Sequence, residues 1–252
     1  MSKRPDLFTS YQKEISIFPN NTQKFWFITL LIASIYVCFI ASDYWLILLT
    51  NALLVSIAAW GLNIVSGLAG QINLAHGVFV GIGTYTSAVL GGVATRSVIG
   101  FELDLIIWLP LSGIAAALIG LIISPIAVRL KGLNLGLVTL AFVFIGAHFF
   151  NNMTFVTGGS GLGRKAAKLN IFGIDFNSGY QIGEFLIQKN QILYLISLLV
   201  TVLLGLGVKN LVRSKTGRAF AAIRDRDIAA EALGINLFKF KATALAISCF
   251  YG

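Results

Sequence analysis

Apolar runs about as long as a bilayer is thick constrain this chain more than any other feature. A helix of roughly twenty residues crosses the ~30 Å hydrocarbon layer of a membrane. Runs close to that length, none containing Asp, Glu, Lys or Arg, occupy residues 25–41, 44–66, 74–94, 105–128, 133–150 and 191–208. A seventh opens at Ala242 and reaches only Gly252, so we expect the protein to continue beyond that residue. The sequence therefore predicts an all-α fold, a polytopic transmembrane helical bundle over residues 25–252.

The composition supports a membrane protein and argues against several other classes. The chain is 57% hydrophobic and 12% charged, outside the range of ordinary soluble domains. Its net charge of +9 would suggest nucleic acid as a partner in a soluble protein, but the charges lie in short segments between apolar runs. Neither an RNA-binding aromatic motif nor zinc-finger spacing occurs, so we predict no nucleic-acid partner.

No residues suggest a cofactor, a metal site or catalysis. The two cysteines, Cys38 and Cys249, lie in apolar runs and indicate neither a disulfide framework nor a metal site. The two histidines, His76 and His148, have no carboxylate or thiolate nearby in the sequence to complete a metal site. Because no nucleophile and base form a recognisable pattern, we expect a protein that is not an enzyme.

The distribution of charge predicts which segments face the cytoplasm. Cytoplasmic loops of membrane proteins carry an excess of Lys and Arg. With residues 1–24 placed inside as a cytoplasmic N-terminal segment, the inner segments hold fourteen of the nineteen Lys and Arg residues and the outer segments hold five. This puts the 209–241 segment in the cytoplasm and the 151–190 segment outside. A cleaved signal peptide is the alternative for the first run, but no Ala-x-Ala site precedes Asp43 and the next run starts at once, which favours an uncleaved helix.

The 209–241 segment is the one long polar stretch between apolar runs. It holds eight of the nineteen basic residues and three of the ten acidic ones. Asp227 can cap a short helix over residues 228–233, and Gly234 can end it in the left-handed region. Ile228 and Ala232 then share one apolar face, which could dock into a groove of a partner. The alternative is that a basic loop only sets the membrane topology, and charge alone favours that alternative.

Three stretches of this segment, residues 213–219, 221–224 and 229–236, resemble a known loop. They are similar to the cytoplasmic loop of ATP-binding-cassette (ABC) importer permeases, and more narrowly to that of the branched-chain amino acid permease family of LivM type. In that family the loop carries the coupling helix that sits on the ATPase subunit. The resemblance implies an ATPase-coupling role for Arg224, Asp227, Ile228, Ala229, Glu231, Ala232 and Gly234.

A second stretch around the start of the third run resembles the same family. The pattern Gly-Gln, Leu-x-His and Gly-x-Gly-x-Tyr-Thr occurs at residues 70–71, 74–76 and 81–86, with Asn73 and Ala75 in place of the Ser and Gly that many members carry. Buried polar groups at membrane depth need partners and often line a cavity. We therefore predict a translocation path that includes Asn63, Gln71, Asn73, His76, Thr84 and Thr86.

Two alternatives stay open for this stretch. The polar side chains could instead bond to neighbouring helices. The crowded glycines could serve close helix packing, or they could mark a broken helix whose freed backbone lines a pathway. Asn73 and His76 are three residues apart, so we expect them on one helical face.

The 151–190 segment is the other long connection. Thr157, Gly158, Gly159 and Ser160 resemble a Thr-Gly-Gly-Ser segment of the same family, and we predict that they help to dock a substrate-binding protein. The run over 158–165 is no phosphate-binding loop, because Arg164 follows the last glycine where that motif needs Lys.

The resemblance implies a permease subunit of an importer in the bacterial inner membrane. Its partners would be a sister permease, two cytoplasmic ATPase subunits, a periplasmic binding protein and the lipid bilayer, and its substrates branched-chain or related amino acids. Related permeases carry urea and short amides, which stay as alternatives. A stand-alone carrier or channel is the rival from another class. The runs contain no Asp, Glu, Lys or Arg for proton coupling, although sodium coupling through backbone carbonyls stays open. A membrane enzyme or scaffold is a further rival.

Overall fold

Helices make up most of the computed structural model of the chain, which describes residues 17–18, 20–95, 98–130, 132–159, 163–171, 174–176, 179–182 and 185–252. The helices are α2 (Asn21–Ile40), α3 (Asp43–Asn63), the π-helical turn η1 (Ile64–Leu68), α4 (His76–Gly91), α5 (Leu105–Arg129), α6 (Leu133–Asn152), α7 (Thr154–Thr157), α9 (Lys189–Arg213), α10 (Lys215–Asp225), α11 (Asp227–Ala232) and α12 (Leu237–Tyr251). Strands β1 (Asn170–Ile171) and β2 (Ile174–Asp175) form one antiparallel hairpin, and β3 (Tyr180–Ile182) and β4 (Phe185–Ile187) form another. The predicted all-α class is confirmed, with these two hairpins as small additions.

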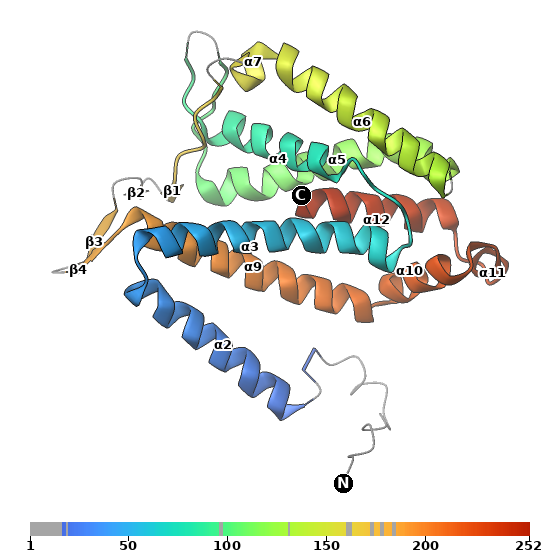
Figure 1. The fold of residues 1–252 in the computed structure, drawn as a ribbon, viewed down its shortest axis with the longest axis horizontal. Helices are drawn as coiled ribbons and strands as arrows, with labels where there is room; N and C mark the ends of the chain where they lie inside the picture. The colour runs from blue at the N-terminus through green and yellow to red at the C-terminus, as the bar shows by residue number, and fades with distance from the viewer. Residues whose placement is uncertain are drawn as a thin grey trace.

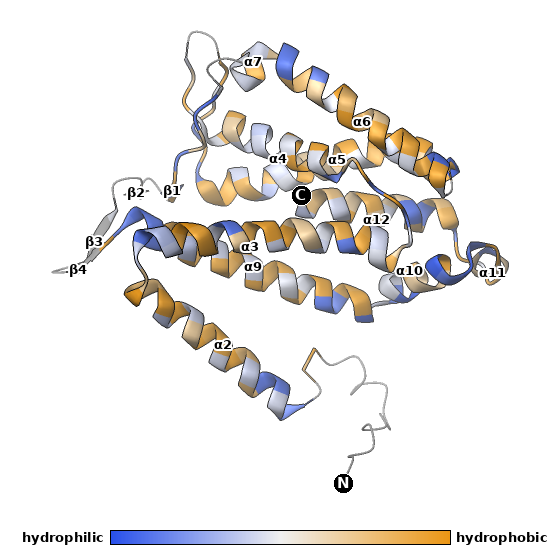
Figure 2. Ribbon diagram, in the orientation of Figure 1, coloured by the Kyte–Doolittle hydropathy of each residue, from blue (hydrophilic) through white to orange (hydrophobic). Residues whose placement is uncertain are grey.

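Five of these helices are long and apolar enough to cross a membrane: α2, α3 continued by η1, α5, α6 and α9. Their outward faces are apolar, and Trp26, Val55, Ile122 and Phe144 are each more than half exposed. Figure 2 shows the hydrophobic colour along the helices and the hydrophilic colour mainly near their ends. Large exposed apolar surfaces of this kind fit a lipid environment rather than water.

Several helices differ from the predicted runs: α2 begins four residues earlier, at Asn21, and α9 covers 189–213 rather than 191–208. α4 covers 76–91 of the expected 74–94, because the chain stays irregular up to Ala75. α12 begins at Leu237 rather than at residue 242, because the Oδ1 atom of Asn236 accepts a hydrogen bond from the Lys239 backbone N–H at 3.0 Å and caps the helix. The polar 209–241 segment therefore contributes the first turn of α12.

The core lies around α12, which runs through the middle of the bundle (Figure 1) and packs against α5, α3 and α4. Glycines allow close contact there. A Cβ atom at Gly120 of α5 would lie 2.6 Å from Cys249 Sγ, and one at Gly61 of α3 would lie 2.8 Å from the Ser248 carbonyl oxygen. Side chains at either position would push the helices apart, so small residues decide how closely α12 packs.

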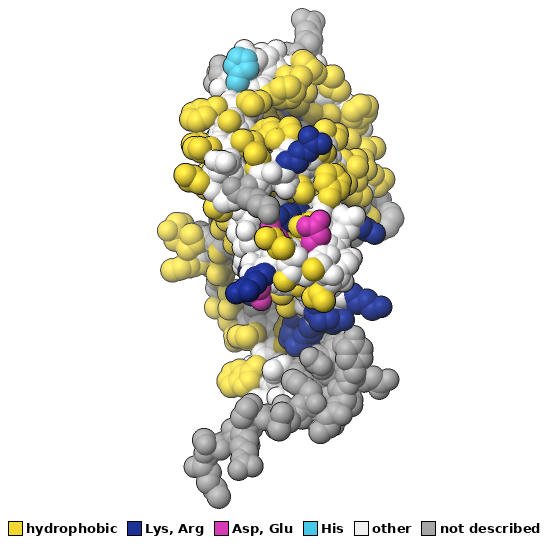
Figure 3. Space-filling view, turned by 90° about the vertical axis from the view of Figure 1, so that its right-hand side faces the viewer, with side chains coloured by type: hydrophobic (Ala, Val, Ile, Leu, Met, Phe, Trp, Pro, Cys, Tyr) yellow, Lys and Arg dark blue, Asp and Glu magenta, His cyan; other side chains and the backbone are white. Residues whose placement is uncertain are grey.

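The helices run along the long axis of the molecule and give it two ends (Figure 1). One end holds α10, α11 and the connection between α5 and α6, and is called the α11 end. The opposite end carries α7 and the two hairpins, and is called the α7 end. Figure 3 looks onto the α11 end, where Lys and Arg side chains gather with acidic ones among them. The two long polar connections, 151–190 and 209–241, thus lie at opposite ends.

Candidate functional site

An irregular segment between α3 and α4 forms the centre of the candidate site. After η1, Gly70 adopts a positive φ of 67°, and helix resumes only at His76. Non-helical backbone at membrane depth occurs where it is buried in protein or lines a cavity. Gly70 therefore lies in an irregular connection between η1 and α4, whereas Gly81 serves close packing, since a Cβ there would lie 2.7 Å from the Phe150 ring. Close packing thus holds at Gly81, and a pathway lined by the irregular segment stays a prediction.

Polar contacts join this irregular segment to α10. The Nη1 atom of Arg224 donates a hydrogen bond to the Gly67 carbonyl oxygen at 3.1 Å. A Cβ at Gly70 would lie 2.8 Å from Arg224 Cγ, so only glycine leaves room for that side chain. α10 itself is held by its buried face, on which Phe220 is fully buried and Ile223 is 4% exposed. A displacement of α10 would thus act directly on the backbone at 67–70.

A second set of contacts joins the segment to α11 through the start of α12. Gln71 Nε2 donates to the Lys241 carbonyl oxygen at 3.3 Å. The Lys241 Nζ atom lies 3.9 Å from Asp227 Oδ2, at the beginning of α11. Lys241 is 8% exposed, which is unusual for a lysine and reflects this packing. The sequence analysis missed Lys241, although it is four residues before the buried Leu245 and eight before Cys249, and so shares their helical face.

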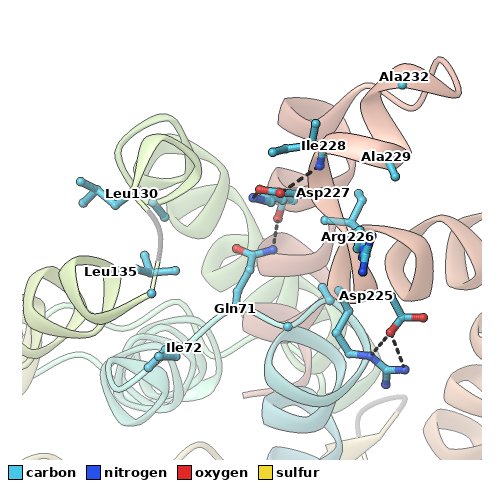
Figure 4. Close-up of a pocket in the computed structure, with 17 residues that line it drawn as sticks. Gln71, Ile72, Leu130, Leu135, Asp225, Arg226, Asp227, Ile228, Ala229 and Ala232 are labelled. Carbon is cyan, nitrogen blue, oxygen red and sulfur yellow. Dashed lines mark hydrogen bonds and ion pairs between the residues drawn. The ribbon is translucent and has the colours of Figure 1, made fainter.

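These elements enclose a cavity of about 680 Å³ at the α11 end. Figure 4 shows Leu130, Leu135 and Ile72 on one side, Arg226 and Asp227 on the other, and Gln71 between them. Polar backbone and charged side chains thus face apolar ones across the cavity. We call it the inner cavity.

α11 presents a small apolar face to solvent at the edge of the inner cavity, which the same residues help to line. Ile228 is 76% exposed, and Ala229 and Ala232 are exposed beside it, whereas Ala230 is buried. Gly234 has the predicted positive φ, at 84°, and its N–H donates to the Glu231 carbonyl oxygen at 2.9 Å. The exposed apolar face is therefore free to meet a partner.

The predicted cap of α11 is wrong. Arg226 occupies the cap position, and Asp227 is the first helical residue. Its Oδ1 atom accepts a hydrogen bond from the Ile228 N–H at 2.9 Å, which the sequence could not distinguish from capping. Glu231 lies exposed on the helix.

Among the predicted path residues, three lie together near the irregular segment. His76, Gln71 and Asn73 are buried, at 8%, 6% and 7% exposure. The expected shared helical face of Asn73 and His76 is wrong, because Asn73 lies in the turn before α4. Its Oδ1 atom accepts a hydrogen bond from the Ala75 N–H at 3.1 Å. His76 contacts the Ala58 carbonyl oxygen through Nε2 at 2.8 Å and Ser248 Oγ through Nδ1 at 3.5 Å, so it bonds to neighbouring helices.

The other three predicted path residues lie apart from that group. Asn63 is exposed at the end of α3. Thr84 is exposed on α4, and its hydroxyl donates to the Val80 carbonyl oxygen at 2.8 Å. Thr86 lines a separate, apolar cavity between α4 and α6. The structure therefore gathers Gln71, Asn73 and His76 and separates the rest from them.

At the α7 end, the predicted docking residues are part of a tight turn. Thr157 is 2% exposed, and its Oγ1 atom accepts a hydrogen bond from the Gly159 N–H at 3.3 Å. Gly158 has a positive φ of 81°, and a Cβ there would collide with the Gly163 carbonyl oxygen. Ser160 lies outside the described residues.

Arg164 and Lys168 fasten this turn to the connection between α4 and α5. Arg164 donates hydrogen bonds to the carbonyl oxygens of Val156, at 3.1 Å, and of Ile99. Burial lowers the pKa of the Arg164 guanidinium from its ordinary value. Lys168 Nζ forms an exposed ion pair with Glu102 at 3.3 Å. The contacts of this end stay near its surface.

Comparison with known proteins gives a consistent match. The family described as "Branched-chain amino acid transport system / permease component" matches residues 44–252. The permease proteins LivM of the high-affinity branched-chain amino acid transport systems of Salmonella typhimurium (strain LT2) and Escherichia coli (strain K12) are each 31% identical over 238 residues. Each alignment covers 90% of this chain and 54% of the relative, so the chain spans about half the length of these curated relatives. No solved structure matches the chain significantly.

Proposed function

The chain belongs to the family of branched-chain amino acid transport system permease components, and from that membership we propose that it is the membrane-spanning subunit of an ATP-driven importer for branched-chain or related amino acids. In this role it forms part of the translocation path and couples to separate ATPase subunits. The observation that carries the proposal is the direct contact of α10 and the start of α12 with η1 and the irregular segment, through Arg224 and Gly67 and through Lys241 and Gln71.

The proposed coupling follows from these contacts. α11 seats its exposed face, with Ile228 and Ala232, in a groove of an ATPase subunit. When ATP binding or hydrolysis moves that groove, α10 and the start of α12 move with it, because they pack on one another. The hydrogen bonds at Gly67 and Gln71 then pass the displacement to the irregular segment inside the membrane part.

The proposed orientation places the α11 end in the cytoplasm and the α7 end outside the cell membrane. The crowding of basic side chains at the α11 end supports this, since cytoplasmic segments are enriched in Lys and Arg. The turn at Thr157, Gly158, Gly159 and Ser160, together with the two hairpins, would then meet a periplasmic substrate-binding protein. A sister permease and a second ATPase would complete the assembly.

Reconstitution tests the function. The full-length protein is purified with its ATPases and sister permease, placed in vesicles, and supplied with the binding protein and labelled leucine, valine or urea. We expect uptake of the amino acids that requires both ATP and the binding protein. An ATPase variant that binds but does not hydrolyse ATP is the control. Equal uptake with that variant would contradict the proposal and support a stand-alone carrier, and preferential uptake of urea would correct the substrate.

The docking role of the α7 end has its own test. Replacing residues 170–187 by a short flexible linker removes the hairpins and leaves the contacts of Arg164 and Lys168 in place. Uptake should fall while basal ATP hydrolysis stays unchanged, because the α11 end is untouched. Unchanged uptake would remove the docking role from the proposal.

A further inference from the structure

Three cavities follow one another along the groove between α4, α5 and α6. An outer cavity of about 430 Å³ extends towards the α7 end, where Met153 and Thr157 line it. A middle cavity of about 20 Å³ lies next to it, and Ile123 and Phe142 line both. The inner cavity at the α11 end shares Gln71, Ile72, Ala127 and Leu135 with the middle one. The shared walls make the three cavities neighbours in one row, with the middle cavity as a neck.

The outer cavity suits an apolar side chain of a small ligand. Its walls are valine, isoleucine, leucine and phenylalanine side chains, with hydroxyl groups only at Tyr85, Thr86 and Thr157 among the described residues that line it. Its volume lies in the range of small-ligand sites, which bury apolar groups against few polar ones. A branched aliphatic side chain can be buried there, whereas urea has no apolar part to bury.

The neck contains an unpaired polar group. The side-chain NH₂ of Asn73 has no hydrogen-bond partner among the residues that the structure describes, although the residue is only 7% exposed. The Ala75 N–H bonds to the Asn73 oxygen at 3.1 Å, and this contact fixes which way the amide points. Buried polar groups are almost always paired, so an unpaired donor here indicates a missing acceptor. A carboxylate oxygen is such an acceptor.

Two of the elements that line the neck, α5 and the irregular segment, carry features that favour movement. On α5, Pro125 lies between Ile123 and Ala127 and has no N–H for the Leu121 carbonyl oxygen, which accepts instead from Ser124 Oγ at 2.7 Å. A proline weakens a helix at this point. The other wall carries Asn73 on the irregular segment, which is bonded to α10 and α12. The weak point and the coupling contacts therefore meet at the neck.

We propose that this groove is the part of the substrate route that the chain contributes. The outer cavity holds the apolar side chain of the amino acid, Ile123 and Phe142 close the neck behind it, and the Asn73 NH₂ binds the carboxylate as it passes. The inference rests on the proposed function, because it assigns a place in this chain to the substrate of that importer.

The main test widens the neck in the reconstituted importer. Ile123→Ala combined with Phe142→Ala should let labelled leucine enter vesicles without ATP or binding protein, at least about tenfold faster than the unaltered protein. The matched control is Ile122→Ala combined with Phe144→Ala. It changes the same residue types on the same helices, at positions that are 75% and 69% exposed and line none of the three cavities. The control should not leak.

A second test does not depend on the widened variant and measures how accessible position 73 is to a thiol reagent. In a background with Cys38→Ala and Cys249→Ala, Asn73→Cys should react with a small polar thiol reagent, and leucine with binding protein should slow the reaction severalfold. Ser112→Cys on α5 is the control, since Ser112 is also 7% exposed but lines none of the three cavities. It should stay unreactive.

The outcomes separate this inference from the proposed function. If the unaltered importer takes up no branched-chain amino acid, the proposed function fails. If it transports, but the widened variant leaks no more than its control and Asn73→Cys is as unreactive as Ser112→Cys, the route is overturned while the function stands. In that case the neck holds at most a structural water bound to Asn73. Labelling of Thr86→Cys by a membrane-soluble reagent but not by a polar one would show lipid in the outer cavity and would also overturn the route.

Discussion

The two long polar connections of this chain, 209–241 and 151–190, differ in what they are attached to. The first folds into α10, α11 and the start of α12, and its Arg224 bonds to a backbone carbonyl within the membrane part. The second folds into a tight turn and two short hairpins, and its Arg164 bonds to the Val156 carbonyl of the same segment and to the Ile99 carbonyl of the connection between α4 and α5. In the proposed coupling, a force applied to the first reaches the irregular segment through Arg224, whereas the second is bonded to another connection at the α7 end. The connection at the α11 end is therefore suited to transmit motion, and the one at the α7 end is suited to hold a partner.

The largest difference between the ends should appear when a bulky side chain is added. Ala232→Trp on α11 should clash with the ATPase groove and lower ATPase co-purification and substrate-stimulated hydrolysis at least about tenfold, which corresponds to ~1.4 kcal/mol of binding. Ala166→Trp, at an exposed position of the α7 end, is the control and should keep the ATPase bound. Full transport by the Ala232→Trp variant would contradict docking by α11 and would leave the basic loop with a role only in membrane topology.

The turn after α11 should be nearly as sensitive. Gly234→Val places a β-branched residue at a φ of 84°, which costs about 1–2 kcal/mol in backbone strain. No atom lies within 4 Å of the added Cβ, so the effect comes from the altered turn rather than from a collision. The variant should still insert in the membrane and lose most ATPase association. Normal association, measured by co-purification, would show that the turn tolerates strain.

A pair of alanine substitutions separates backbone strain from contact. Gly70 and Gly163 have similar positive φ angles, 67° and 63°, but only at Gly70 would a Cβ meet another residue, at 2.8 Å from Arg224. Gly70→Ala should therefore lower uptake about tenfold, through strain of ~1 kcal/mol plus displacement of α10. Gly163→Ala should keep most uptake. Equal effects of the two substitutions would mean that the contact between α10 and the irregular segment does not contribute to uptake.

Replacing Arg224 and Arg164 should have smaller effects, and these should differ between the two residues. Arg224→Gln loses the hydrogen bond to Gly67 and should keep the ATPase bound while the amount of amino acid transported per ATP falls severalfold, since one charged hydrogen bond is worth about 1.5–3 kcal/mol. Arg164→Gln should leave that ratio unchanged and weaken binding-protein docking instead. The ratio of uptake to ATP hydrolysis, with docking measured separately, tests both. An unchanged ratio in Arg224→Gln would contradict the coupling route.

The smallest effects concern the two lysine ion pairs. Lys168 and Glu102 are exposed, so Lys168→Ala should change the free energy of unfolding by no more than about 0.5 kcal/mol. Lys241→Ala should cost about 1–2 kcal/mol, because its stem is buried at 8% exposure as well as paired with Asp227. Thermal unfolding in detergent compares them. A larger loss for Lys168→Ala than for Lys241→Ala would contradict this order.

Much of the fold could be predicted because it depends on local properties of the sequence. The length of the apolar runs predicted α3, α5, α6 and α9 closely, and Gly234 was expected at the positive φ that ends α11. The predictions failed where the backbone leaves the helical conformation. Asn73 and His76 were expected on one helix, but the chain stays irregular up to Ala75, whose N–H donates to the Asn73 side chain, and nothing in the local spacing shows that α4 begins only at His76.

Sequence alone determined that this chain is a helical membrane protein, which end carries the basic segment, and which family it resembles, because apolar length, charge and short motifs are read along the chain. Only the tertiary structure decided which polar residues find hydrogen-bond partners and which stay unpaired. Gln71 finds its partner 170 residues away at Lys241 and His76 finds one 172 residues away at Ser248, whereas the Asn73 NH₂ finds none. Hydrogen-bond pairing depends on which helices meet in space, and the packing of α12 against α3, α4 and α5 sets that arrangement.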